Sequence, residues 1–202
     1  MAAAVVGGAT NTASGNCAFV GGGQDNNASA QYATVIGGRG AGAYLYGQFA
    51  TSSNNISANA DAQTSLFTLI REITGTSQTE LFLDGGSLRA ILKATNRLWN
   101  FEISISGFCS AAGNGVGITA GDAWVSWHSG GIKRLNTSTS LIGSVQTPAT
   151  AQSDTGMSTS TVTIDADDTN EALRIRITPP ATAGSTTVTR WIAVVKLAEL
   201  GY

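Results

Sequence analysis

Residues 5–38 read VVGGATNTASGNCAFVGGGQDNNASAQYATVIGG, and this stretch repeats itself with a period of fifteen residues. The recurring pairs are Val5/Val20, Gly7/Gly22, Gly8/Gly23, Asn11/Asn26, Ala13/Ala28 and Ser14/Ser29, with Tyr32 standing fifteen residues after Cys17. Ala18, Val20, Gly22 and Gly23 recur once more as Ala33, Val35, Gly37 and Gly38. A fixed period of this kind indicates stacked structural units.

Each unit contains a short apolar piece, a glycine corner and an Asn-rich bend. Fifteen residues are too few for a helical hairpin but suit one turn of a β-solenoid, in which glycine accepts positive φ at the corners. We therefore predict a narrow β-roll over residues 1–50. The residues expected in its core or in a trimer contact are Val5, Val20, Val35 and Ile36.

A roll of this size has little core of its own. A single turn of Ala, Val and Gly buries too little apolar surface to offset the entropy lost on ordering it. Partner chains are expected to supply the missing contacts, which predicts a homotrimer.

The run ASGNCAFVGGGQDNNASAQYATVIGG at residues 13–38 resembles the head repeats of trimeric autotransporter adhesins (YadA-like heads), which also occur in bacteriophage tail fibres. The resemblance covers roughly residues 5–45. It implies three chains, each forming a left-handed β-roll, packed around a threefold axis.

The composition limits the possible functions. The 202 residues include only 12% charged side chains and carry a net charge of −2, so the chain lacks the positive surface that nucleic-acid binding requires. No apolar run approaches the length of a membrane span, and the N-terminus lacks the pattern of a signal peptide. We expect no membrane insertion and no usual secretion. Cys17 and Cys109 are expected to be buried free thiols, with a contact between Cys17 copies in a trimer as the alternative.

After a polar connector at residues 51–61, the sequence pattern changes to longer expected strands separated by loops. Trp99, Phe101, Ile103 and Ile105 alternate with polar residues, which is typical of a half-buried strand. The last strand is apolar on both faces, and we assign its Trp191 to the core or the trimer contact. Residues 62–202 are therefore predicted to form an antiparallel, jelly-roll-like β-sandwich, which makes the whole chain all-β.

This second part also carries a resemblance. Residues 79–85, 131–134 followed by 141–143, 167–173 and 190–195 are similar to a β-sandwich found at the C-terminus of many phage tail-fibre proteins. The resemblance implies a bacteriophage virion protein, made in the host cytoplasm and located in the tail fibre.

The sequence offers little catalytic chemistry. His128 is the single histidine, there is no Gly-x-Ser-x-Gly motif, and no acidic pair stands in a glycosidase-like context. We expect no enzymatic activity, no cofactor and no metal site. The acidic segment from Asp165 to Glu171 favours a solvated loop, although whether it binds Ca²⁺ stays open.

The candidate receptor contacts are aromatic and polar. In a strand, Trp124 and His128 share one face and Trp127 points to the other, so at most one indole is expected to be exposed, where a sugar could stack on it. Core packing or a trimer contact is the alternative for these aromatic residues. Two polar loops at residues 111–122 and 147–159 contribute the further candidates Asn114, Gln152 and Ser153.

Two functions remain. The first is a distal tail fibre that attaches to a host-surface receptor, expected to be a glycan. The alternative is a trimeric capsid decoration or head-fibre protein with no receptor role, located on the capsid surface. In either case the partners are two copies of the chain and other virion proteins.

Overall fold

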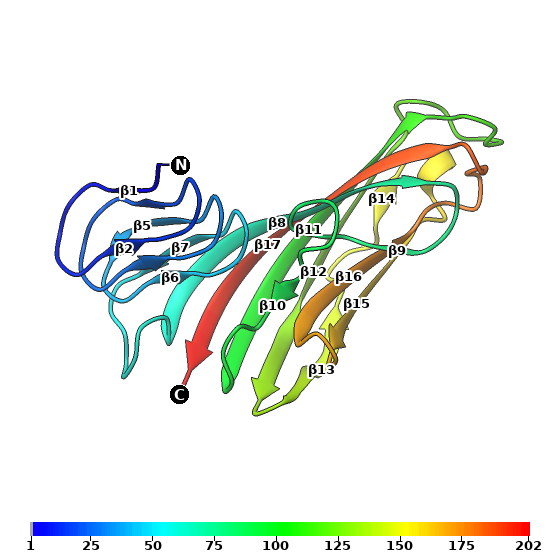
Figure 1. Cartoon of the computed structure of the whole chain (residues 1–202). Helices are drawn as coiled ribbons and strands as arrows, with labels where there is room; N and C mark the ends of the chain where they lie inside the picture. Colours follow the sequence, from blue (N-terminus) through cyan, green and yellow to red (C-terminus); the bar gives the residue numbers. More distant parts are fainter. Residues whose placement is uncertain (1) are drawn as a thin grey trace.

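The computed structural model describes residues 2–202, and these residues form strands, loops and a single 3-10 turn, η1 (Thr155–Met157) (Figure 1). The predicted all-β class is confirmed. Within residues 2–202, no helix has the length and apolar character needed to cross a bilayer.

The N-terminal part is a β-roll. Its strands form two parallel stacks, and the residues at Ala4, Phe19, Thr34 and Phe49 lie directly above one another, so each turn takes fifteen residues. The first stack contains β1 (Ala4–Val5), β3 (Phe19–Val20), β5 (Thr34–Gly38) and β7 (Phe49–Ser52); the second contains β2 (Thr12–Ala13), β4 (Asn27–Ala28) and β6 (Gly42–Ala43). The repeat period thus predicted the solenoid.

An asparagine ladder links neighbouring turns of the roll. The Asn11 amide donates to the carbonyls of Gly7 and Gly23 at 2.8 and 2.9 Å, and its oxygen accepts from the N–H of Asn26. Asn26 repeats the arrangement one turn on, where its oxygen accepts from the N–H of Ala41 at 2.9 Å. The ladder satisfies corner backbone groups that lie outside the strands.

The roll core consists of Val20, Val35 and a set of alanines. Ile36 and Val5 do not belong to it, and their assignment to the core of a single chain is wrong: they are 55% and 44% exposed. Ile36 follows the inward-pointing Val35 and so points outward, whereas Val5 lies in the first turn that the structure describes, which within residues 2–202 is stacked on one side only. Cys17 is also exposed, contrary to expectation, while Cys109 is buried.

The C-terminal part is an antiparallel sandwich of two sheets, as predicted. One sheet contains β8 (Ala62–Thr74), β17 (Val188–Gly201), β11 (Arg97–Ala111), β12 (Ala123–Leu135), β13 (Ser138–Gln146) and β14 (Gln152–Ser153). The other contains β9 (Thr79–Glu80), β10 (Ala90–Ile91), β16 (Ala172–Thr178) and β15 (Thr161–Asp167). Side chains such as Phe101, Ile103 and Ile175 fill the space between them.

The roll and the sandwich share one sheet. Strand β7 of the roll pairs antiparallel with β8, Phe49 lying opposite Leu66, so a single long sheet runs from β1 to β13. Figure 1 shows the roll at one end of this sheet and the second sandwich sheet toward the other. The second wall of the roll and the second sandwich sheet cover the same face, and we call it the covered face.

We call the opposite face of the long sheet the outer face. Within residues 2–202, neither the second wall of the roll nor the second sandwich sheet lies over it. Large apolar side chains are nevertheless exposed there, on the roll and on the sandwich alike. They include Phe19, Ile36, Leu66, Ile70, Phe108, Trp127 and Ile192.

The segment between the roll and β8 is fixed by Asp61. Its carboxylate accepts hydrogen bonds from the N–H groups of Ile56, Ser57 and Ala58 at 2.6 to 2.8 Å. Burial alone would raise the pKa of Asp61, but these hydrogen bonds outweigh it and lower the pKa to about 2.

Candidate functional site

A groove opens on the covered face where the roll ends and the second sandwich sheet begins. It consists of two adjoining hollows of about 290 and 410 Å³, which share Tyr44, Leu45, Ile91 and Lys93. We call it the junction groove. The first hollow is completed by residues that include Arg97, Trp99 and Glu199, and the second by residues that include Gln31, Tyr46, Leu88 and Arg89.

The floor beneath the first hollow is a polar row on the covered face. Gln63, Glu199 and Trp99 are cross-strand neighbours on β8, β17 and β11. The Glu199 carboxylate accepts from Gln63 Nε2 at 3.0 Å and from Trp99 Nε1 at 2.8 Å. The pKa of Glu199 is raised, because burial is the largest effect on it. The hydrogen bonds from Gln63 and Trp99 and the charge of Arg97 act in the opposite direction.

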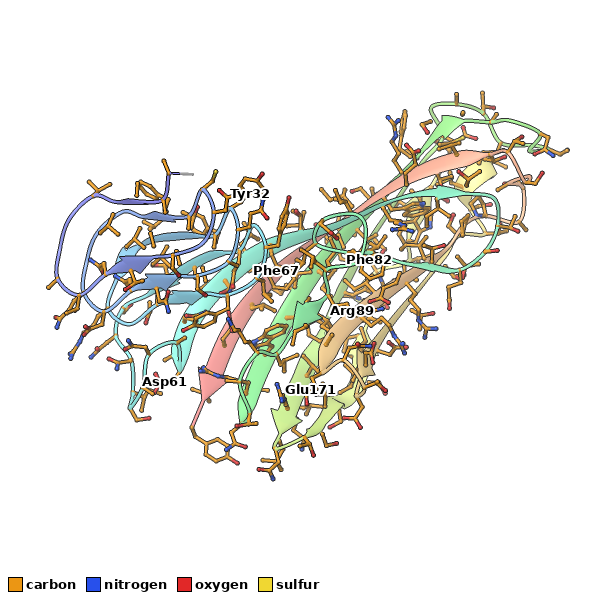
Figure 2. All side chains as sticks on the ribbon, in the orientation of Figure 1. Tyr32, Asp61, Phe67, Phe82, Arg89 and Glu171 are labelled. Atoms are coloured by element: carbon orange, nitrogen blue, oxygen red, sulfur yellow. The ribbon has the colours of Figure 1, made fainter. Side chains whose placement is uncertain are left out.

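One wall of the groove is aromatic and comes from the roll. Tyr44 and Tyr46 follow β6 and are both half-buried, and the Tyr46 ring meets the edge of Tyr32 with centroids 5.3 Å apart. Burial raises the pKa of Tyr44, which the nearby Arg97 opposes, so the phenol stays protonated at neutral pH. Figure 2 shows Tyr32 on the side of the roll that faces the sandwich.

The other wall carries cations. Lys93 Nζ lies 5.0 Å from the centre of the Tyr44 ring, a distance at which a cation is attracted to the ring face. Arg89 lies 5.3 Å from the ring centre of Phe82 and pairs with Glu80 at 3.0 Å. Both Phe82 and Arg89 are labelled in Figure 2 across from the roll.

These features suit a carbohydrate. Sugar rings present C–H faces that pack on aromatic side chains, and hydroxyl groups that exchange hydrogen bonds with charged and amide groups. The junction groove places two tyrosines, three cationic side chains and a carboxyl within one concave surface.

The predicted aromatic contacts are separated by the sheet. Trp124 is 3% exposed and packs against Trp191 with ring centroids 5.6 Å apart, so neither indole reaches the surface. The surface role assigned to Trp124 is therefore wrong, and Trp191 belongs to the sandwich core instead of the roll core. The alternation of side chains along β12 explains this, because Trp124 faces the second sheet.

Trp127 is 45% exposed on the outer face. It lines a hollow of about 480 Å³ together with His128 and Pro148. Ser126 Oγ lies 2.8 Å from His128 Nε2, but Ser126 is buried and cannot act as a nucleophile toward a substrate. Burial lowers the pKa of His128, so the ring is neutral at pH 7. Receptor contact by Trp127 and His128 stays a prediction.

The polar loop candidates are exposed but lie apart. Asn114 is tied to the 184–187 segment, because its oxygen accepts from the N–H of Thr186 at 2.9 Å. Gln152 and Ser153 form β14, which pairs with β12 beside Trp124. Their role in binding also stays a prediction.

The acidic segment 165–171 is engaged by arginines. Asp165 pairs with Arg174 at 2.7 Å and with Arg176, and Asp167 accepts from the Asn170 amide at 2.8 Å. Within residues 2–202, no group of three or more His, Cys, Asp or Glu side chains is placed to hold a metal ion.

The sequence reasoning missed Lys93, Arg97 and Glu199. They come from different strands and loops and form no local motif. One signal was present: Gln63 and Glu199 stand at positions of β8 and β17 where the alternation calls for an apolar residue facing inward. A polar residue at such an inward-facing position indicates a part of the covered face that the apolar core does not fill.

No family model and no curated protein matches the chain. The solved structures that resemble it include two phage tailspike proteins. One is the tailspike protein of Acinetobacter baumannii phage AM24, with 11% identity and a TM-score of 0.41 over 91% of this chain and 34% of that one. The other is the tailspike protein gp49 of Acinetobacter baumannii bacteriophage Fri1, described as a capsular polysaccharide depolymerase, with 10% identity and a TM-score of 0.35 over 91% and 29%. The chain thus spans about a third of the length of these proteins.

These comparisons change two expectations. The depolymerase description of the second structure contradicts the expectation that the chain has no enzymatic activity. The two structures are phage tailspike proteins, and the resemblance of the repeats to autotransporter heads is not confirmed by them.

Proposed function

We propose that the chain is part of a bacteriophage tail protein that binds a host-surface polysaccharide in the junction groove. The observation that carries this proposal is the groove itself. Tyr44 and Tyr46 form one of its walls, and Lys93 and Arg97 line the same hollow as Tyr44. The tail location follows from the tail-fibre resemblance of the repeats and of residues 62–202.

The outer face supports assembly with further copies of the chain. Its exposed apolar residues occur on both the roll and the sandwich, which the pairing of β7 with β8 joins into one sheet. A face with many large exposed apolar side chains is typical of a surface that contacts another protein. A homotrimer covers it, and leaves the junction groove on the opposite face accessible.

Binding of immobilised protein to a panel of purified bacterial capsular polysaccharides tests the proposal. We expect Tyr44→Ala and Tyr46→Ala each to weaken binding roughly 5-fold, since an aromatic contact contributes about 1 kcal/mol. Tyr202→Ala is the matched control, because Tyr202 is 84% exposed and lies outside the groove. If the intact protein binds no polysaccharide and adsorbs to no host cell, the capsid-decoration alternative is favoured.

A second candidate function is cleavage of the bound polysaccharide. It is favoured by Glu199, a carboxyl on the groove floor whose pKa is raised by burial, as in general acids of sugar-cleaving enzymes. Gel filtration of the polysaccharide after incubation would show shorter chains with the intact protein. Glu199→Gln is expected to stop the cleavage and leave binding in place.

A further inference from the structure

The charges at the first hollow of the junction groove are unbalanced. Lys93 is exposed, and within residues 2–202 neither Lys93 nor Arg97 forms an ion pair. Arg89, by contrast, is engaged by Glu80 and lies 3.8 Å from Asp167. Two cations therefore face this hollow in a chain whose net charge is −2.

Within residues 2–202, the carboxyl on the floor forms no ion pair with either cation, although the charge of Arg97 acts on it in the direction of a lower pKa. Both Glu199 oxygens accept hydrogen bonds from uncharged donors, Oε1 from Gln63 and Oε2 from Trp99. Arg97 is held in place by a hydrogen bond to the carbonyl of Ala60. This hydrogen bond restricts the guanidinium, whose remaining N–H groups can donate to an anion in the hollow that Arg97 lines.

We propose that the first hollow binds the carboxylate of an acidic sugar, such as a uronic acid, between Lys93 and Arg97, with Tyr44 against the sugar ring. This inference rests on the proposed polysaccharide binding and specifies its ligand. A guanidinium and an ammonium together recognise a carboxylate by charge-assisted hydrogen bonds. The aromatic wall favours a sugar over an acidic peptide, because a sugar ring has a flat C–H face that packs on the Tyr44 ring and a glutamate side chain has none.

The test compares an oligogalacturonate with the same oligosaccharide after its carboxyl groups have been reduced to alcohols. Binding of both to the intact protein is measured by calorimetry at low salt. We expect the acidic form to bind at least about 10-fold more tightly, because a hydrogen bond to a charged group contributes about 1.5 kcal/mol or more. A hexaglutamate peptide is expected to bind more weakly than the acidic sugar.

Variants assign the effect to the groove. Lys93→Gln is expected to remove most of the preference for the acidic form and leave binding of the reduced form unchanged. Arg97→Lys keeps the positive charge at this position, so the variant is expected to fold. It is expected to bind the acidic sugar more weakly, because lysine lacks the paired N–H donors of the guanidinium. Lys133→Gln is the matched control, since Lys133 is exposed but does not line this groove.

The possible failures are distinguishable. Equal binding of the acidic and reduced sugars, with loss of both in Tyr44→Ala, overturns the acidic-sugar inference and supports the proposed function. Binding of neither sugar overturns the inference, and with no binding on the capsular panel it overturns the proposed function as well. Hexaglutamate binding as tight as the acidic sugar would identify the hollow as a general carboxylate site.

Discussion

At the scale of single residues, two of the positions in the roll that have positive φ differ in whether they require glycine. The position of Cys17, Tyr32 and Gly47 has φ of 55 to 64°, and side chains are accepted there because they project into solvent. The position of Gly8, Gly23 and Gly38 has φ of 87 to 93°, and there the next turn approaches so closely that a Cβ atom would overlap its carbonyl oxygen. Glycine is needed at this position chiefly because a side chain would prevent the close contact between turns.

Gly23→Ala is therefore expected to lower the free energy of unfolding by at least about 2 kcal/mol, from backbone strain and overlap with Gly38 together. Gly47→Ala is the control, because its φ is also positive but nothing lies within 4 Å of the added methyl group. It is expected to cost about 1 kcal/mol. Chemical denaturation of both variants checks this, and equal losses would show that contact between turns does not set the requirement.

At the scale of elements, the sequence predicted what depends on local periodicity. The fifteen-residue repeat predicted the roll, and alternation in residues 99–105 predicted a half-buried strand, because both patterns are consequences of which side chains face a core. The junction groove could not be predicted, since its walls come from the roll, from β10 and β11, and from β17. Their proximity follows from the pairing of β7 with β8, a long-range register that no local pattern specifies.

Neighbouring residues in β5 separate the two roles of the roll. Val35 is fully buried, whereas Ile36 points to the outer face. Val35→Asp is expected to unfold the roll, because an unpaired buried carboxylate costs several kcal/mol. Ile36→Asp is expected to leave the roll folded and weaken only the contact between chains.

Far-UV circular dichroism and native mass spectrometry together distinguish these outcomes. Val35→Asp should lose both structure and assembly, and Val20→Asp should behave in the same way since Val20 is equally buried. A folded Val35→Asp protein would contradict the inward direction of this side chain. Loss of structure in Ile36→Asp would contradict the outward one.

At the scale of the whole molecule, the long sheet divides the chain into two surfaces with different properties. The covered face carries the core and, between its two covers, the polar floor of the junction groove. The outer face carries exposed apolar residues crossed by the ion pairs Arg190–Glu72 at 2.8 Å and Lys196–Glu102 at 3.4 Å. This separation allows one face to bind copies of the chain while the other binds a ligand.

Replacing an apolar residue at the centre of the outer face should therefore release folded single chains. Ile192 lies beside Ile70 on β8 and opposite Ser106 on β11, with its side chain exposed in the single chain. In the proposed homotrimer, Ile192→Glu places an unpaired carboxylate in each of the contacts, and breaking a buried apolar contact in this way costs several kcal/mol per chain. We expect native mass spectrometry at micromolar concentration to show trimer for the intact protein and monomer for Ile192→Glu, with unchanged circular dichroism.

The control is Val116→Glu, which makes the same kind of change at an 82% exposed loop residue and should remain trimeric. A folded monomer for the intact protein would refute the homotrimer, and a trimeric Ile192→Glu would show that the chains meet elsewhere than on the outer face.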